Sequence, residues 1–134
     1  MKVEPIRLNQ LAQKFGLDLI ILFGSHARGQ THRESDVDVA VHAISKDHDW
    51  QWEINLIREM VFALDCDNLD VTRTNNVSPL LMYEIARDGI PLYEENEGVF
   101  ENFQIYAAKR HADSYKIYRI QQLYLEDRLD EILS

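Results

Sequence analysis

Two aspartates of the sequence are spaced so that their carboxylates can bind one cation together. Asp36 and Asp38 lie one residue apart in the segment DVDVAVH, in which every second residue is valine. On a strand this alternation turns both carboxylates out of one face, about 6.6 Å apart along the chain. Neighbouring carboxylates raise each other's pKa unless a cation lies between them, and hard oxygen ligands favour Mg²⁺. The pair therefore predicts a magnesium site.

A later aspartate offers another ligand. Asp70 lies between Leu69 and Val71, in a segment typical of a short strand. If that strand lies beside the strand that carries Asp36 and Asp38, the three carboxylates converge. Such a trio can hold two Mg²⁺ ions about 3.5–4 Å apart, one for an incoming nucleophile and one for a triphosphate. Asp70 can also accept the proton of the nucleophile.

A Gly-Ser turn precedes the aspartates and directly follows the apolar segment LDLIILF. Gly24 permits a sharp bend and a close approach to a ligand, Ser25 adds a hydroxyl, and nearby amides can bind phosphates. The planar guanidinium of Arg28 suits phosphate oxygens, but it can equally anchor the loop to carboxylates of the domain itself. Gly24, Ser25 and Arg28 are therefore the candidate nucleotide-binding residues.

Each of these signals is weak by itself. A D-x-D on a strand is more often a solvated face than a metal site, and a Gly-Ser turn after a strand is commonly only a turn. The joint pattern carries the prediction, because one chain places the turn, the paired aspartates and Asp70 on successive strands. A P-loop would require Gly-Lys-Ser/Thr, which does not occur in the sequence.

The surrounding sequence predicts the elements that position these residues. Pro5 opens a helix that ends at Gly16, and Ser78-Pro79 opens another that stops near Gly89. The remaining expectations are strands over 17–23, 36–42, 69–72 and 90–93, a helix over 50–64 that buries Ile54, Ile57, Val61 and Leu64, and helix from about residue 98 to 133. This order indicates an α+β (mixed α/β) domain with a small mixed sheet.

Composition narrows the function further. A chain of 134 residues that is 46% hydrophobic predicts one folded domain, residues 1–134. The net charge of −9 argues against nucleic acid as the main substrate. Cys66 is the single cysteine, the first residues show no signal peptide, and no apolar stretch is long enough to span a bilayer. These features favour the cytoplasm and no membrane association.

The segment FGSHARGQTHRESDVDVAV, residues 23–41, resembles the signature of the polymerase-β-type nucleotidyltransferases. It is most similar to their minimal MNT-type members, whose G-S-x-A-R-G and S-D-x-D motifs it matches. The resemblance covers roughly residues 17–95 and implies a palm-like nucleotidyltransferase fold. It also implies that Gly24 and Ser25 bind the phosphates of a nucleoside triphosphate, that Asp36 and Asp38 bind two Mg²⁺ ions, and that Asp70 completes the triad.

MNT proteins of this length resemble the antitoxin of bacterial and archaeal HEPN/MNT pairs. That resemblance implies transfer of AMP from ATP to a tyrosine of a HEPN ribonuclease toxin, within a hetero-oligomer. Two alternatives stay open: an antitoxin that neutralises the toxin by binding alone, and a small-molecule adenylyltransferase of the antibiotic-resistance kind. The short chain leaves little to build an acceptor pocket for the second alternative.

The segment over about residues 98–134 predicts a partner-binding surface. As one unbroken helix it would reach about 50 Å, longer than a small sheet requires. Its last part carries apolar residues over more than half of the helical circumference: Ile117, Tyr118, Ile120, Tyr124, Leu125, Leu129, Ile132 and Leu133. Apolar surface of this kind usually marks a protein contact. A helical hairpin bent near residues 111–114 would instead bury it, and self-association is a further possibility.

Overall fold

A computed structural model describes residues 1–29 and 36–134 of the chain. Residues 30–35, which include Ser35 of the S-D-x-D motif, lie outside the described residues. The elements run in the order α1 (Pro5–Phe15), β1 (Leu17–Phe23), β2 (Val37–Ala43), α2 (Trp50–Leu64), β3 (Leu69–Arg73), the 3₁₀ turn η1 (Thr74–Asn76), α3 (Pro79–Asp88), β4 (Ile90–Glu94) and α4 (Val99–Leu133). The predicted α+β class is confirmed.

The four strands form one mixed sheet in the order β3-β2-β1-β4. β1 pairs antiparallel with both β2 and β4, whereas β2 and β3 run parallel. A parallel pair requires a crossover connection, and α2 supplies it between β2 and β3. Pro91 lies on β4 at an edge of the sheet, where a missing backbone N–H costs least.

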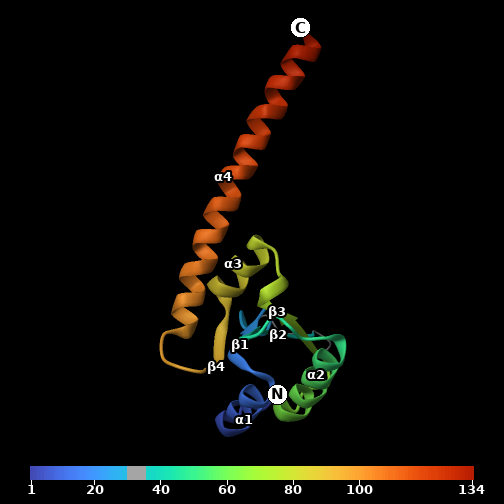
Figure 1. Cartoon of the computed structure of the whole chain (residues 1–134), viewed down its shortest axis with the longest axis vertical. Helices are drawn as coiled ribbons and strands as arrows, with labels where there is room; N and C mark the ends of the chain where they lie inside the picture. Colours follow the sequence, from blue (N-terminus) through green and yellow to red (C-terminus); the bar gives the residue numbers. More distant parts are fainter. Residues whose placement is uncertain (30–35) are drawn as a thin grey trace.

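The two faces of the sheet are covered by different helices (Figure 1). α1 and α2 cover one face, and Val37, Val39 and Val41 enter that core together with Leu8 and Met60. α3 and the first part of α4 cover the other face, where the core contains Leu19, Ile21, Ala40 and Ile85. Alternation along β2 therefore turns its valines to the first face and its even-numbered residues to the second.

The helix ends follow the predicted capping signals, but the buried side of α2 differs from the prediction. Gly16 ends α1 at φ 66°, and the side chain of Ser78 accepts a hydrogen bond from the backbone N–H of Leu81. In α2 the buried residues are Leu56, Met60, Ala63 and Leu64. Ile54 is 45% exposed, so its place in the predicted stripe is wrong. α2 carries apolar residues on more than one side, and contact with α1 and the sheet selects the side around Leu56.

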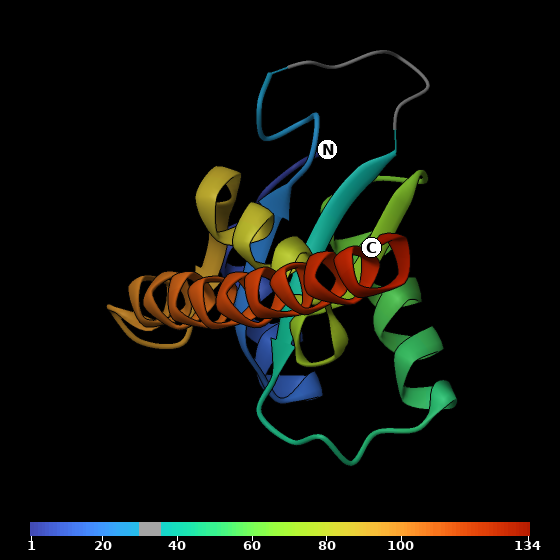
Figure 2. The same cartoon turned by 90° about the horizontal axis from the view of Figure 1, so that it is seen from above.

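α4 is one continuous helix of 35 residues, about 52 Å long. It leaves the sheet and projects far beyond it (Figure 1), and seen from above it crosses over the strands (Figure 2). The alternative of a hairpin bent near residues 111–114 is therefore wrong. Ala107 is the buried residue of this helix, and every large apolar residue from Tyr115 to Leu133 is exposed. Among the described residues, no helix has both the length and the apolar character needed to cross a membrane.

Candidate active site

Asp38 and Asp70 face one another across the parallel pair of β2 and β3. They are direct partners in the register of the two strands, and Val39 pairs next to them with Val71. Because the valines enter the core beneath α1 and α2, both carboxylates project from the face that α3 and α4 partly cover. Asp36 lies just before β2 and is exposed. The predicted neighbourhood of the strands that carry the carboxylates is thus present.

The Gly24 turn lies against Asp38. Phe23, the last residue of β1, pairs with Asp38, and Gly24 then bends the chain at φ 76°. A Cβ atom at Gly24 would overlap with the Oδ2 atom of Asp38, so only glycine fits here without displacing the carboxylate. The backbone N–H of Arg28 donates to the carbonyl of Gly24 at 3.2 Å, which closes one helical turn that includes Ser25.

The electrostatic environment of Asp38 disfavours its charge. Burial raises the pKa of the Asp38 carboxyl above its usual 3.8, and the charges of Asp70 and Asp36 raise it further. His26 and Arg28 act in the opposite direction, but they do not cancel the increase in the pKa. Like charges gathered beside a half-buried carboxylate are the arrangement that a bound cation relieves.

The donor set fits a cation that is shared with a ligand. Within residues 1–29 and 36–134, no three His, Cys, Asp or Glu side chains are grouped so that they could hold an ion by themselves. Mg²⁺ is commonly bound by one or two carboxylates, and water and substrate phosphates complete its octahedron. Asp38 with Asp70 or Asp36 meets that requirement, and the Gly24 turn provides a place for phosphates beside it.

Arg28 lies between two groups of carboxylates. Its Nη1 atom is 3.8 Å from Oδ2 of Asp88, at the end of α3, and its charge lowers the pKa of Asp38. Asp88 already accepts two hydrogen bonds from Arg87, at 3.1 and 2.9 Å. The contact between Arg28 and Asp88 is long, and Arg28 is also near enough to Asp38 to influence its pKa.

Comparison with known proteins defines the family. The family model described as "Polymerase beta, Nucleotidyltransferase" matches residues 7–98, which include the Gly24 turn and all three aspartates. The chain belongs to this nucleotidyltransferase family. The protein adenylyltransferase MntA of Aphanizomenon flos-aquae is 30% identical over 111 residues, which cover 77% of this chain and 74% of the relative.

Solved structures share the fold of this nucleotidyltransferase. A crystal structure of a toxin–antitoxin with AMP-PNP matches with a TM-score of 0.64 and 24% identity, over 98% of this chain and 99% of the other. A tri-AMPylated Shewanella oneidensis HEPN toxin in complex with MNT antitoxin matches with a TM-score of 0.58 and 21% identity, over 97% and 96% of the two chains. The matches extend over α4 as well as the sheet.

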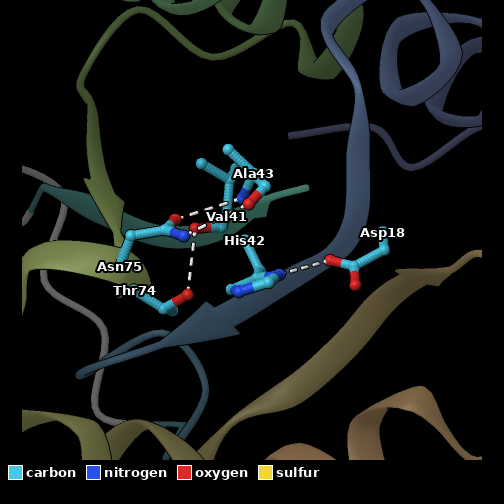
Figure 3. A network of polar contacts seen from close by, with 6 residues as sticks. All are labelled: Asp18, Val41, His42, Ala43, Thr74 and Asn75. Carbon is cyan, nitrogen blue, oxygen red and sulfur yellow. Dashed lines mark hydrogen bonds and ion pairs between the residues drawn. The ribbon is translucent and has the colours of Figure 1, made fainter. Parts of the chain in front are cut away.

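Sequence reasoning missed a second polar group on the same face of the nucleotidyltransferase sheet. Oδ1 of Asp18 lies 2.6 Å from Nδ1 of His42, and the two side chains point toward each other from β1 and β2 (Figure 3). The side chain of Asn75 bonds both the N–H and the carbonyl of Ala43, at 3.2 and 3.1 Å (Figure 3). The signal was present: in DVDVAVH, His42 shares the face of Asp36 and Asp38.

Proposed function

We propose that this nucleotidyltransferase transfers AMP from ATP to a tyrosine of a HEPN ribonuclease and thereby inactivates it as an antitoxin. The observation that carries the proposal is the pairing of Asp38 with Asp70, with Gly24 against the carboxylate of Asp38. Two comparisons give it direction: an adenylyltransferase that is 30% identical, and an AMPylated HEPN toxin in the complex that shares the fold. ATP as the donor and a lone cysteine fit the cytoplasm.

In this proposal the phosphates of ATP lie on the turn after β1. Backbone amides after the bend at Gly24 and the hydroxyl of Ser25 would donate to the phosphates. Arg28, now 3.8 Å from Asp88, would turn its guanidinium toward them. Asp36, Asp38 and Asp70 would hold two Mg²⁺ ions, which when bound supply positive charge for the triphosphate and lower the pKa of the attacking hydroxyl. The aspartates would thereby place the positive charge of the ions beside the turn at Gly24.

The chemistry is an in-line substitution at the α-phosphorus. The acceptor oxygen forms a bond to this phosphorus while the bond to the bridging oxygen of the β-phosphate breaks, and pyrophosphate leaves with that electron pair. Asp70 accepts the proton of the tyrosine hydroxyl. The turn at Gly24 positions the triphosphate. Burial and the charges of Asp70 and Asp36 raise the pKa of Asp38, and a cation held by these aspartates would favour its ionised form.

The distal part of α4 provides the surface for the partner. We call it the α4 surface and define it as Ile117, Tyr118, Ile120, Tyr124, Leu125, Leu129, Ile132 and Leu133, which are between 55% and 81% exposed. Exposed apolar side chains of this number, which cover nothing in their own chain, usually mark a contact with another protein. A HEPN protein in a hetero-oligomer is the occupant that we propose, because the matched chain, which covers 97% of this chain, comes from a complex of a HEPN toxin with an MNT antitoxin.

Transfer of radiolabelled AMP tests the proposal. The chain is co-purified with a candidate HEPN protein and incubated with α-labelled ATP and Mg²⁺. We expect label on the HEPN protein, and we expect Asp38→Asn to reduce it at least about a thousandfold with the complex intact, because a ligand charge is lost and the shape is kept. Asp67→Asn is the matched control, since Asp67 is an exposed aspartate outside the site.

Three outcomes would contradict the proposal. Labelling by Asp38→Asn near the level of the wild type would remove Asp38 from the mechanism. Inhibition of the ribonuclease without any label on it would show an antitoxin that acts by binding alone. Pyrophosphate release that depends on a small-molecule acceptor, without the HEPN protein, would show an adenylyltransferase of the antibiotic-resistance kind.

A further inference from the structure

A cavity lies on the same face of the sheet as Asp38, at the other end of β2. We call it the His42 cavity; its volume is about 580 Å³, and its lining includes Asp18, His42, Lys46, Phe103, Tyr106 and Arg110. Pockets of this size typically hold small organic ligands. Gly24, Ser25, Asp36, Asp38 and Asp70 do not line it, so it is distinct from the proposed catalytic site.

The charged groups of the His42 cavity favour an anion, although the chain as a whole carries −9. Lys46 and Arg110 contribute two cations, whereas the carboxylate of Asp18 is already paired with His42 at 2.6 Å. Nη1 of Arg110 donates to the carbonyl of Val77 at 3.2 Å, which fixes the guanidinium and leaves its other N–H groups. Within the described part of the chain, Lys46 forms no ion pair.

The rest of the lining suits a flat ring. Phe103 and Tyr106 lie one turn apart on α4, and Leu19 and Met82 add apolar surface from the sheet and α3. Tyr106 is 57% exposed, so its ring is available at the rim. Aromatic faces stack on nucleobases in proteins that bind nucleotides. Apolar and aromatic surface together with two cations in one cavity therefore fits a ligand that joins a ring to a phosphate.

We infer that the His42 cavity binds a nucleoside monophosphate, with the phosphate at Lys46 and Arg110 and the base against Phe103 and Tyr106. His42 lies four positions after Asp38 on β2, about 13 Å along the strand and on the same face. Free AMP can fill the cavity. An AMP unit already attached to the acceptor protein can also fill it while a further AMP is transferred at the catalytic site. This second source rests on the proposed function.

Binding of AMP to the purified chain, measured by calorimetry without ATP or divalent cations, tests the inference independently of catalysis. We expect saturable binding of AMP and weaker binding of both adenosine and inorganic phosphate, because each lacks half of the ligand. Lys46→Gln should weaken AMP binding about tenfold through loss of a charge-assisted hydrogen bond. Lys109→Gln, an exposed lysine of α4 outside the cavity, should leave AMP binding unchanged.

Asp38→Asn separates the two sites. AMP binding that persists in Asp38→Asn and weakens in Lys46→Gln supports the His42 cavity, even if no transfer to a HEPN protein is found. AMP binding that weakens in Asp38→Asn and is unchanged in Lys46→Gln would overturn the inference. So would the absence of AMP binding, or an affinity for inorganic phosphate equal to that for AMP.

The two sources of the nucleotide are distinguished by mass spectrometry of the co-purified HEPN protein after reaction with ATP. If Lys46→Gln permits the first addition of AMP but blocks later ones, the cavity receives attached AMP. If the number of additions is unchanged while AMP binding to Lys46→Gln is weakened, the cavity receives free AMP.

Discussion

The sheet and the distal part of α4 use apolar residues in opposite ways. In the sheet, Ile20, Ile21, Val39 and Val41 are fully buried, and they hold Asp38 and Asp70 in register. Along α4, Ile132 is 71% exposed although its side chain is as apolar as those of the sheet. Tyr83 stacks on His111 at 4.3 Å, and beyond that point no described side-chain bond joins α4 to another element.

This difference separates the structural requirements of catalysis from those of partner binding. The carboxylates depend on strand register, which a buried face specifies strongly, so the proposed catalytic site belongs to the stable part of the fold. The distal helix is held by its own backbone bonds and by local pairs such as Tyr124 with Arg128. Changes in the sheet should therefore affect transfer, whereas changes in distal α4 should affect association and leave the fold intact.

The turn at Gly24 should show the largest effect among these tests. Gly24→Ala adds a Cβ that overlaps with Oδ2 of Asp38, and it does so at a φ of 76°. A displacement of about 1 Å in a reacting group can cost about a hundredfold in rate, and we expect a loss of AMP transfer of that size. The rate of labelling of the HEPN protein at saturating ATP measures it.

Gly29→Ala is the matched control. Gly29 has nearly the same backbone conformation, at φ 74°, but an added Cβ meets no atom of residues 1–29 and 36–134 within 4 Å. Both variants carry the same backbone strain, of about 1 kcal/mol. Equal losses of transfer in the two variants would show that strain in the loop, and not the contact with Asp38, limits the reaction.

The order of the elements follows from local patterns, whereas the pairing that sets Asp38 beside Asp70 was only a condition of the prediction. The valines of β2 and the caps at Gly16 and Ser78 are signals within a few residues, and the structure confirms them. The roles of the aspartates in binding metal and in catalysis stay predictions, as do those of Gly24, Ser25 and Arg28. The division into one domain with a partner-binding segment over about 98–134 also stays a prediction.

Other features depend on contacts between distant segments, which a single sequence does not reveal. Ile54 was expected in the core, but α2 has more than one apolar side and its packing against α1 selects another. The His42 cavity joins residues from β1, β2, η1 and α4, and its parts have no common motif. The helical pattern of the sequence predicts the length of α4, but whether the helix bends depends on what it contacts.

The α4 surface should show the next largest effect. Leu125→Glu places a charge on an apolar side of the helix where a partner would exclude water, and we expect the affinity for the HEPN protein to fall about thirtyfold. Arg119→Gln lowers the net charge by the same amount on the polar side of the helix and should change affinity less than twofold. Calorimetric titration of the separated proteins measures both affinities.

The melting temperature of the free chain sharpens the same test. Leu125 is 59% exposed, so neither variant should shift the melting temperature of the unbound protein appreciably. An unfolded Leu125→Glu variant would mean that the α4 surface is part of the fold, and unchanged affinity would mean that the partner binds elsewhere.

Arg28 tests whether the loop contacts its own domain or the nucleotide. Arg28→Ala should raise the KM for ATP about tenfold, the size of a lost charge-assisted hydrogen bond to phosphate. Asp88→Asn removes the other end of the 3.8 Å contact and should leave the KM within about twofold, because a long ion pair with one exposed partner contributes little. Similar increases in KM for the two variants would show that Arg28 acts only by anchoring the loop to α3.

The pKa of Asp38 predicts the smallest effect. Burial and the charges of Asp70 and Asp36 raise this pKa above 3.8, so the folded protein holds the proton of Asp38 to a higher pH than the unfolded chain does. The folded state then binds more protons, and the free energy of unfolding falls as the pH rises through that interval. Asp38→Asn removes this loss of stability, and at pH 7 without divalent cations it should melt slightly above the wild type, by at most about 3 °C.

Acid and Mg²⁺ should each remove that difference. Below the pKa of an unfolded aspartate, both states of the wild type are protonated at Asp38, so the two melting temperatures should converge toward about pH 3. Mg²⁺ with an ATP analogue binds the ionised carboxylates, so it should stabilise the wild type and leave Asp38→Asn nearly unchanged. Scanning calorimetry of both variants, with Asp67→Asn as control, measures these shifts. A wild type that melts above Asp38→Asn at pH 7 without any divalent cation would contradict this prediction. It would show that the Asp38 carboxylate itself stabilises the sheet and is not a destabilising charge kept for a ligand.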